Sequence, residues 1–179
     1  MSLADYQEKI ATRFDTFDRD GDGAVTVADF DALAVAILDE YGLSEDSPKG
    51  RRLMSGAEHF WSSLSGMADM NADTGVSREE FVEAATTYLY NDRAAFQRMV
   101  QPWASAVIAV ADADDDGQVT VPEWERMLRA MRATPERAHA KAAALDADHD
   151  GVITLDEVLE SAVRFYTADE PSRDFAMAR

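Results

Sequence analysis

Hydrophobic side chains recur every three or four residues along most of this chain, which is the spacing of an α-helix with one buried face. In residues 3–17, for example, Tyr6, Ile10, Phe14 and Phe17 share one face. The same spacing predicts further helices over residues 30–41, 51–68, 81–88, 96–111, 124–131, 135–145 and 158–165. The pattern therefore predicts an all-α protein. Pro102 is expected to kink or break its helix, because proline lacks a backbone donor.

Polar loops separate these helices, and one of them has a distinctive order of residues. From Asp146 to Glu157 it reads Asp-Ala-Asp-His-Asp-Gly-Val-Ile-Thr-Leu-Asp-Glu. Carboxylates stand at positions 1, 3, 5 and 12, and Gly151 at position 6 suits a sharp turn with positive φ. This is the spacing of an EF-hand calcium loop.

Calcium explains the spacing, because this hard cation takes about six to eight oxygen ligands. Asp146, Asp148 and Asp150 would point inward, and the Val152 carbonyl would add a fourth oxygen. Glu157 is long enough to bind the ion with both oxygens. Residues 154–157 also form a capping box, so the same segment is predicted to start the next helix.

Two other loops repeat this order. Residues 112–123 keep every expected ligand, namely Asp112, Asp114, Asp116, the Gln118 carbonyl and Glu123. Residues 18–29 offer Asp18, Asp20, Asp22, the Ala24 carbonyl and Asp29. Because Asp29 is one methylene shorter than glutamate, bidentate binding is doubtful and a mixed calcium and magnesium site is expected there.

A fourth loop, residues 69–80, departs from the pattern. It supplies oxygen atoms from Asp69, Asn71, Asp73, Ser77 and Glu80. However, Thr74 occupies position 6, where positive φ would cost a β-branched residue about 1–3 kcal/mol. We therefore expect a weak or empty second site, whose Val76 can still pair with Val25.

Position 8 of every loop is β-branched, which favours a short strand pairing between neighbouring loops. These residues are Val25, Val76, Val119 and Ile153. The expected organisation is an N-terminal pair of hands in residues 1–91, with loops 18–29 and 69–80. A C-terminal pair in residues 92–179 would contain loops 112–123 and 146–157. The two pairs are predicted to form one compact globule.

The charge of the chain agrees with cation binding. There are 35 acidic and 17 basic side chains, which gives a net charge of −18. Bulk electrostatics therefore disfavour nucleic acid and anionic membranes as partners. The chain contains no cysteine, no apolar core of a signal peptide and no apolar run of about 20 residues. The expectation is a cytoplasmic monomer whose protein partner, if it has one, the sequence does not identify.

The chain resembles the EF-hand superfamily, and within it the sarcoplasmic calcium-binding proteins and the bacterial calerythrin-like proteins. The resemblance is carried by residues 13–18, by Asp29, by the defective second loop and by residues 96–102 before the third loop. The loops begin at positions 18, 69, 112 and 146, which are 51, 43 and 34 residues apart; the first two spacings are wide and only the last is close to a compact hand-to-hand repeat. The resemblance implies calcium sites in loops one, three and four, and members of this group are usually regarded as calcium buffers.

Two functions remain open at this stage: a calcium buffer, or a sensor that exposes an apolar groove to a partner. A sensor of the calmodulin type would cluster methionines on its groove helices. The methionines here are scattered, at positions 1, 54, 67, 70, 99, 127, 131 and 177, which favours the buffer. Catalysis is not expected, because His59, His139 and His149 belong to no recognisable catalytic motif.

Overall fold

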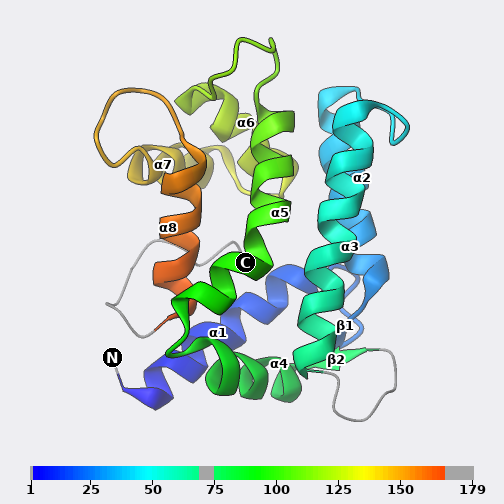
Figure 1. Ribbon diagram of the computed structural model, residues 1–179, viewed down its shortest axis with the longest axis vertical. Helices are drawn as coiled ribbons and strands as arrows, with labels where there is room; N and C mark the ends of the chain where they lie inside the picture. Colours follow the sequence, from blue (N-terminus) through cyan, green and yellow to red (C-terminus); the bar gives the residue numbers. More distant parts are fainter. Residues whose placement is uncertain (1, 69–74, 168–179) are drawn as a thin grey trace.

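The computed structural model describes residues 2–68 and 75–167, and Figure 1 shows helices packed around each other with only a very small sheet. The N-terminal half contains α1 (Leu3–Phe17), β1 (Ala24–Val25), α2 (Val27–Tyr41), α3 (Pro48–Ala68), β2 (Val76–Ser77), α4 (Arg78–Ala84) and the π-helix η1 (Ala85–Leu89). The C-terminal half contains α5 (Arg93–Ala111), α6 (Val121–Ala130), α7 (Pro135–Leu145) and α8 (Leu155–Tyr166). The all-α prediction is confirmed.

Local signals set most helix ends where the sequence predicts them. α1 spans the predicted residues 3–17, and α2 ends at Tyr41 because Gly42 adopts a left-handed conformation with φ of 64°. α3 begins at Pro48, earlier than the predicted residue 51. Proline is well tolerated in a first helical turn, and the Ser47 hydroxyl accepts a hydrogen bond from the N–H of Gly50 at 3.0 Å.

Pro102 bends α5 without ending it. The helix is continuous over Arg93–Ala111 with the proline inside, and Figure 1 shows it changing direction part-way along. Of the two predicted outcomes, a kink or a break, the structure therefore has the kink. A kink is expected because proline removes one hydrogen bond and its ring clashes with the preceding turn.

The helix after β2 departs from the predicted register. In the helix predicted over residues 81–88, the helical spacing of Phe81, Ala84, Ala85 and Tyr88 would turn Tyr88 inward, but its side chain is 51% exposed and Leu89 is buried instead. The segment 85–89 is a π-helix, in which each turn contains more residues than an α-helical turn. The next inward position after Ala85 therefore falls at residue 89 rather than 88. The pattern of hydrophobic residues did not reveal this local change.

Neighbouring loops pair as predicted. β1 and β2 are antiparallel, with Val25 opposite Val76. In the C-terminal half, the N–H of Ile153 donates to the Val119 carbonyl at 2.6 Å. The loops are thus joined two by two, into the expected pairs of hands. Whether residues 91 and 92 separate two domains stays a prediction.

The two halves pack against each other along α3 and α5, which lie side by side in Figure 1. The ends of the fold are also joined, because the Tyr6 hydroxyl shares its single hydrogen between the carbonyls of Ala85 (3.1 Å) and Tyr166 (2.9 Å). Arg13 donates to the buried Tyr166 hydroxyl at 3.0 Å. These hydrogen bonds join α1 to both η1 and α8. Within residues 2–68 and 75–167, no helix combines the length and apolar character that crossing a membrane requires.

Candidate metal centres

Three groups of carboxylates converge in the part of the chain that the structure describes. In each group, one oxygen from every member lies within 4.8 Å of the others. The members are Asp18, Asp20 and Asp22 in the first loop, Asp112, Asp114 and Glu123 in the third, and Asp146, Asp148 and Glu157 in the fourth. Clusters of hard oxygen ligands at this separation suit a calcium ion, which binds oxygen at roughly 2.3–2.6 Å.

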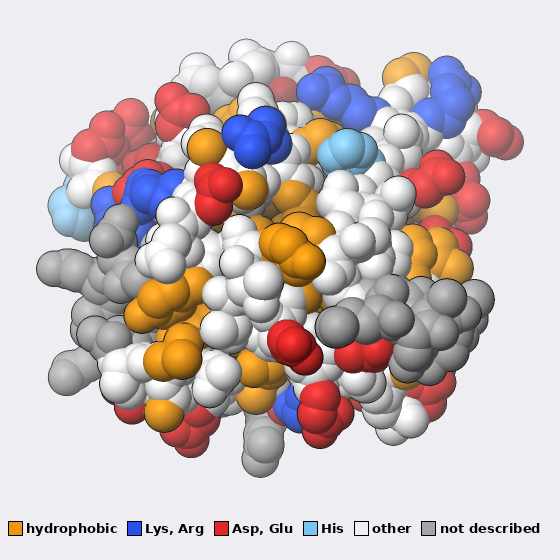
Figure 2. Space-filling model, turned by 60° about the horizontal axis from the view of Figure 1, so that its bottom comes forward, with side chains coloured by type: hydrophobic (Ala, Val, Ile, Leu, Met, Phe, Trp, Pro, Cys, Tyr) orange, Lys and Arg blue, Asp and Glu red, His pale blue; other side chains and the backbone are white. Residues whose placement is uncertain are grey.

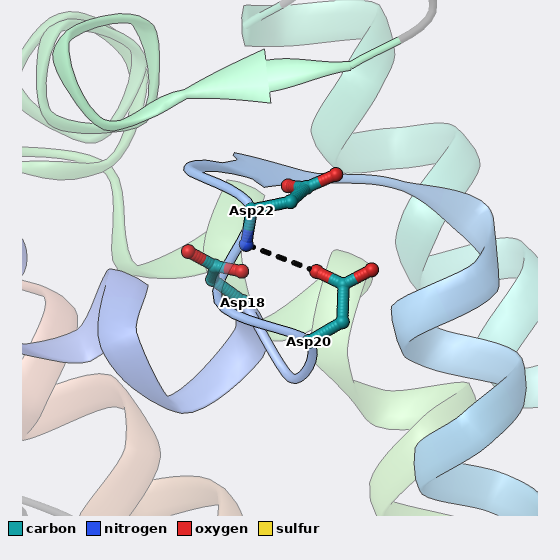
Figure 3. Close-up of side chains that lie close together, drawn as sticks. All are labelled: Asp18, Asp20 and Asp22. Atoms are coloured by element: carbon teal, nitrogen blue, oxygen red, sulfur yellow. Dashed lines mark hydrogen bonds between the residues drawn. The ribbon is translucent and has the colours of Figure 1, made fainter.

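The first cluster lies in the loop between α1 and α2. Figure 3 shows Asp18, Asp20 and Asp22 close together, with the N–H of Asp22 donating to Asp20 Oδ1 at 3.1 Å. The N–H of Gly21 donates to Asp18 Oδ1 at 2.9 Å. These backbone bonds hold the aspartates of the loop in place, so little chain ordering would accompany ion binding.

The third and fourth clusters include the glutamate at position 12, as the sequence predicts. Glu123 accepts hydrogen bonds from the N–H of Ala113 (3.0 Å) and the N–H of Thr120 (2.9 Å). Glu157 accepts the equivalent bonds from Ala147 and Thr154, each at 2.9 Å. The same carboxylate therefore caps the exit helix and faces the loop, which confirms the capping box, while its role as a calcium ligand stays a prediction.

Asp29 behaves differently from its two glutamate counterparts. It accepts the matching hydrogen bonds, from the N–H of Arg19 at 2.8 Å and of Thr26 at 2.9 Å, and only 5% of it is exposed. Yet it is absent from the cluster of Asp18, Asp20 and Asp22 in the described residues. The shorter side chain of Asp29 therefore accepts the two backbone hydrogen bonds, but its oxygens do not join the cluster of Asp18, Asp20 and Asp22.

The residues at position 7 of the three loops each make the same backbone hydrogen bond. The N–H groups of Ala24, Gln118 and Val152 each donate at 2.8 Å to the aspartate at position 5 of the same loop. Those aspartates are Asp22, Asp116 and Asp150, and the last two lie outside the clusters of their loops within the described chain. The roles of Asp116 and Asp150, and of the three carbonyl oxygens at position 7, as ligands stay predictions.

Glycine at position 6 adopts the expected left-handed conformation, with φ of 95° at Gly23 and 85° at Gly117 and Gly151. Position 4 is left-handed too, which the sequence reasoning missed. Its φ is 75° at Gly21, 60° at Asp115 and 61° at His149. Gly21 could have revealed the left-handed conformation at position 4, because only glycine adopts it without a steric cost.

His149→Gly is expected to raise the free energy of unfolding by about 0.5–1 kcal/mol, because it removes a side chain from a left-handed position. Chemical denaturation at saturating calcium measures the change. Asp115→Gly in the third loop should gain less, because aspartate tolerates this conformation better than most residues. A loss of stability in His149→Gly would contradict the strain argument.

Among the described residues, two side chains of the N-terminal half bind the third loop. Lys49 Nζ, at the start of α3, donates to the Asp112 carbonyl at 2.6 Å and lies 2.5 Å from Asp115 Oδ1. The Tyr41 hydroxyl donates to the Glu123 carbonyl at 3.2 Å. Nothing in the sequence pattern pointed to these contacts, since they join residues 63 to 82 positions apart.

The glutamates at position 12 have a lowered pKa. Burial alone would raise the pKa of Glu123, but the hydrogen bonds from Thr120 and Ala113 together lower it below its ordinary value of 4.5. Glu157 has a lowered pKa for the same reasons, with Thr154 and Ala147 as donors. Both side chains are therefore stabilised in the charged form that binds a cation.

A folded-state pKa below the unfolded value means that these glutamates stabilise the calcium-free fold above about pH 4.5. That contribution is expected to disappear as the pH falls through the lowered folded pKa. Denaturation of the calcium-free protein between pH 7 and pH 3 measures it. The variant Glu123→Gln should show a shallower acid-induced loss of stability than the wild type, and an identical slope would contradict the assignment.

The second loop is only partly described. Asp69, Asn71, Asp73 and Thr74 lie outside the described residues, so the predicted weakness at Thr74 is untested. At the other end of the loop, Glu80 accepts a hydrogen bond from the N–H of Ser77 at 2.9 Å. This is the contact that position 12 makes in the other three loops.

Comparison with known proteins agrees with this arrangement. A family model described as EF hand matches residues 10–34, 105–128 and 143–160, which contain the first, third and fourth loops. The solved structure of a calcium-binding protein from Streptomyces coelicolor, described as a structural basis for prokaryotic calcium-mediated regulation, is 40% identical in sequence. The match covers 90% of this chain and 97% of that one, with a TM-score of 0.85.

Two curated proteins are similar as well. Calerythrin from Saccharopolyspora erythraea is 25% identical over 167 residues, which is 93% of this chain and 94% of calerythrin. The beta chain of a sarcoplasmic calcium-binding protein from Penaeus sp. is 29% identical over 113 residues, covering 60% of this chain and 57% of that protein. The relatives are thus of the two kinds that the sequence resembles.

Proposed function

Because the chain belongs to the EF-hand family of calcium-binding proteins, we propose that it is an intracellular calcium buffer with three sites. The sites are loops 18–29, 112–123 and 146–157, while the second loop is weak or empty. The observation that carries the proposal is the set of three carboxylate clusters, each built within one loop. Because residue 29 is an aspartate rather than the longer glutamate, the first site should bind magnesium more readily than the other two.

The surface of the protein supports a buffer over a sensor. Within the described residues, the large hydrophobic side chains that are exposed are Leu3, Val27 and Tyr88, on three different elements. On the face shown in Figure 2, hydrophobic side chains form small groups separated by polar and charged ones. Met99 and Met127 are buried in the core rather than lining a groove. Buffer proteins of this family open little when calcium binds.

Calorimetric titration with calcium, with and without magnesium, tests the number of sites. Three bound ions are expected, one of them weakened by magnesium. A stoichiometry of four would contradict the proposed weakness of the second loop. A stoichiometry of two would contradict the proposal that the first loop binds despite Asp29.

A calcium sensor is the second candidate, and one finding favours it. The relative from Streptomyces coelicolor is described in terms of calcium-mediated regulation. A sensor would open a hydrophobic groove on binding calcium, so a dye that fluoresces on apolar surfaces separates the two functions. A buffer should leave the fluorescence nearly unchanged on calcium addition, whereas a large increase would support the sensor.

We also infer that the protein binds ions rather than catalyses a reaction. Its three histidines are exposed and stand on three different segments, namely α3, α7 and the fourth loop. His139 contacts Glu125 at 2.8 Å, but no nucleophile completes that pair among the described residues. The relatives reported above are described as calcium-binding proteins, which supports the same conclusion.

A further inference from the structure

A polar groove runs between α3 and α5, and no member of the three carboxylate clusters lines it. Its volume is about 590 Å³. It is lined by Arg52, Ser55, Gly56 and His59 of α3 and by Arg98, Gln101, Pro102 and Ser105 of α5. A hollow of this size is in the range of about 300–1,000 Å³ that is typical of small-molecule sites.

The lining of the groove contains no acidic side chain. This is unexpected in a chain with 35 acidic and 17 basic residues. In the described part of the chain, the side chains of Arg52, His59 and Arg98 form no hydrogen bond or ion pair with another residue. Several other cations do pair with carboxylates, namely Lys49, Arg78, Arg93, Arg126, Arg129 and Arg164.

The walls of the groove are held at a fixed separation. A Cβ atom added at Gly56 would lie 3.2 Å from the Cα of Trp103 and 3.3 Å from the carbonyl oxygen of Pro102. The two helix backbones therefore touch at this point, and glycine permits the close approach. Arg52 and His59 stand one turn either side of Gly56 on α3, and Arg98 stands one turn before Pro102 on α5. The side chains that can donate hydrogen bonds therefore line one groove, and they are carried by two helices in direct contact.

We propose that this groove binds the phosphate group of a small organic ligand. Two guanidinium groups, one from each wall, can each donate two parallel hydrogen bonds to an oxyanion. Gln101, Ser55 and Ser105 add neutral donors around the same hollow. Together they offer more hydrogen-bond donors than the two oxygens of a carboxylate accept, but a phosphate ester presents three oxygens and up to two negative charges. This role goes beyond calcium buffering and does not depend on it.

Nuclear magnetic resonance of the calcium-loaded, ¹⁵N-labelled protein tests the proposal, at constant ionic strength and without free calcium that would precipitate phosphate. Glycerol 3-phosphate is the probe, and glycerol and acetate are the controls. Saturable shifts are expected at the amides of the groove residues of α3 and α5, with glycerol giving none and acetate a weaker response. Equal shifts with acetate, or no saturation with glycerol 3-phosphate, would overturn the proposal.

Substitutions then distinguish the groove from general charge. Arg52→Gln and Arg98→Gln should each weaken binding about tenfold, as expected for loss of a charged hydrogen-bonding partner. Arg51→Gln removes the same charge from the same turn of α3, but Arg51 does not line the groove. It should change the affinity less than about twofold. All three variants should keep the helical circular dichroism and the calcium stoichiometry of the wild type. If Arg51→Gln weakens binding as much as Arg52→Gln, bulk charge explains the binding and the site is refuted.

Discussion

Glu157→Gln is expected to lower the calcium affinity of the fourth loop about 100-fold, equivalent to about 2.8 kcal/mol. The substitution removes a charge from the group formed by Asp146, Asp148 and Glu157. It also exchanges one of two equivalent oxygens for an amide nitrogen, which cannot bind a cation. Glutamine can keep the helix-capping bond from Thr154 through its one oxygen but loses the bond from Ala147, so the fold should survive with a small loss of stability. In a calorimetric titration, the number of tight sites should fall from three to two.

Asp156→Asn is the matched control, since it removes the same charge from the neighbouring position. Asp156 belongs to none of the three clusters. It should leave three tight sites, with affinities changed only by the small effect of an exposed charge. If both variants lose one site, the loss reflects overall charge rather than coordination. If Glu157→Gln retains three tight sites, the proposed ligand role of Glu157 is wrong.

Asp29→Glu is expected to raise the preference of the first site for calcium over magnesium about tenfold. The added methylene lets the carboxylate reach towards Asp18, Asp20 and Asp22, a group that Asp29 does not join. A bidentate seventh oxygen suits calcium, whereas magnesium requires six ligands at shorter distances of about 2.0–2.1 Å. The N–H groups of Arg19 and Thr26, which bind Asp29, can still be satisfied, as Glu123 shows in the third loop.

The reciprocal variant Glu123→Asp provides the control, because it should give the third loop the behaviour of the first. Calcium titrations with and without magnesium count the sites that magnesium weakens. One such site is expected in the wild type, none in Asp29→Glu and two in Glu123→Asp. An unchanged count in both variants would show that the length of residue 12 does not set ion selectivity here.

The helices and the three carboxylate clusters could be predicted from sequence, because both depend on residues close together in the chain. The spacing of Tyr6, Ile10, Phe14 and Phe17 defines α1 without reference to the rest of the fold. In the same way, the cluster of the first loop is formed within five consecutive residues. Hydrogen bonds from position 2 and position 9 to position 12 are local as well.

Features that depend on distant neighbours could not be predicted. Lys49 reaches the third loop only because α3 packs against α5, and the sequence marks neither partner. The polar groove between α3 and α5 arises from the same packing, and nothing in the sequence around Arg52 or Arg98 indicates that the two residues line one groove. The π-helix at residues 85–89 involves a local geometry that leaves no clear pattern of apolar residues.

The hydrogen bonds of the Tyr6 hydroxyl have a consequence for protein synthesis. Its partner carbonyl at Tyr166 follows it by 160 positions. A ribosome adding about 5–20 residues per second makes Tyr166 roughly 10–30 s after Tyr6. During that time α1 can pack against α4, but the side of Tyr6 that α8 will cover has no partner from its own chain. The nascent chain is therefore vulnerable to aggregation or chaperone capture at its first helix until its last helix emerges.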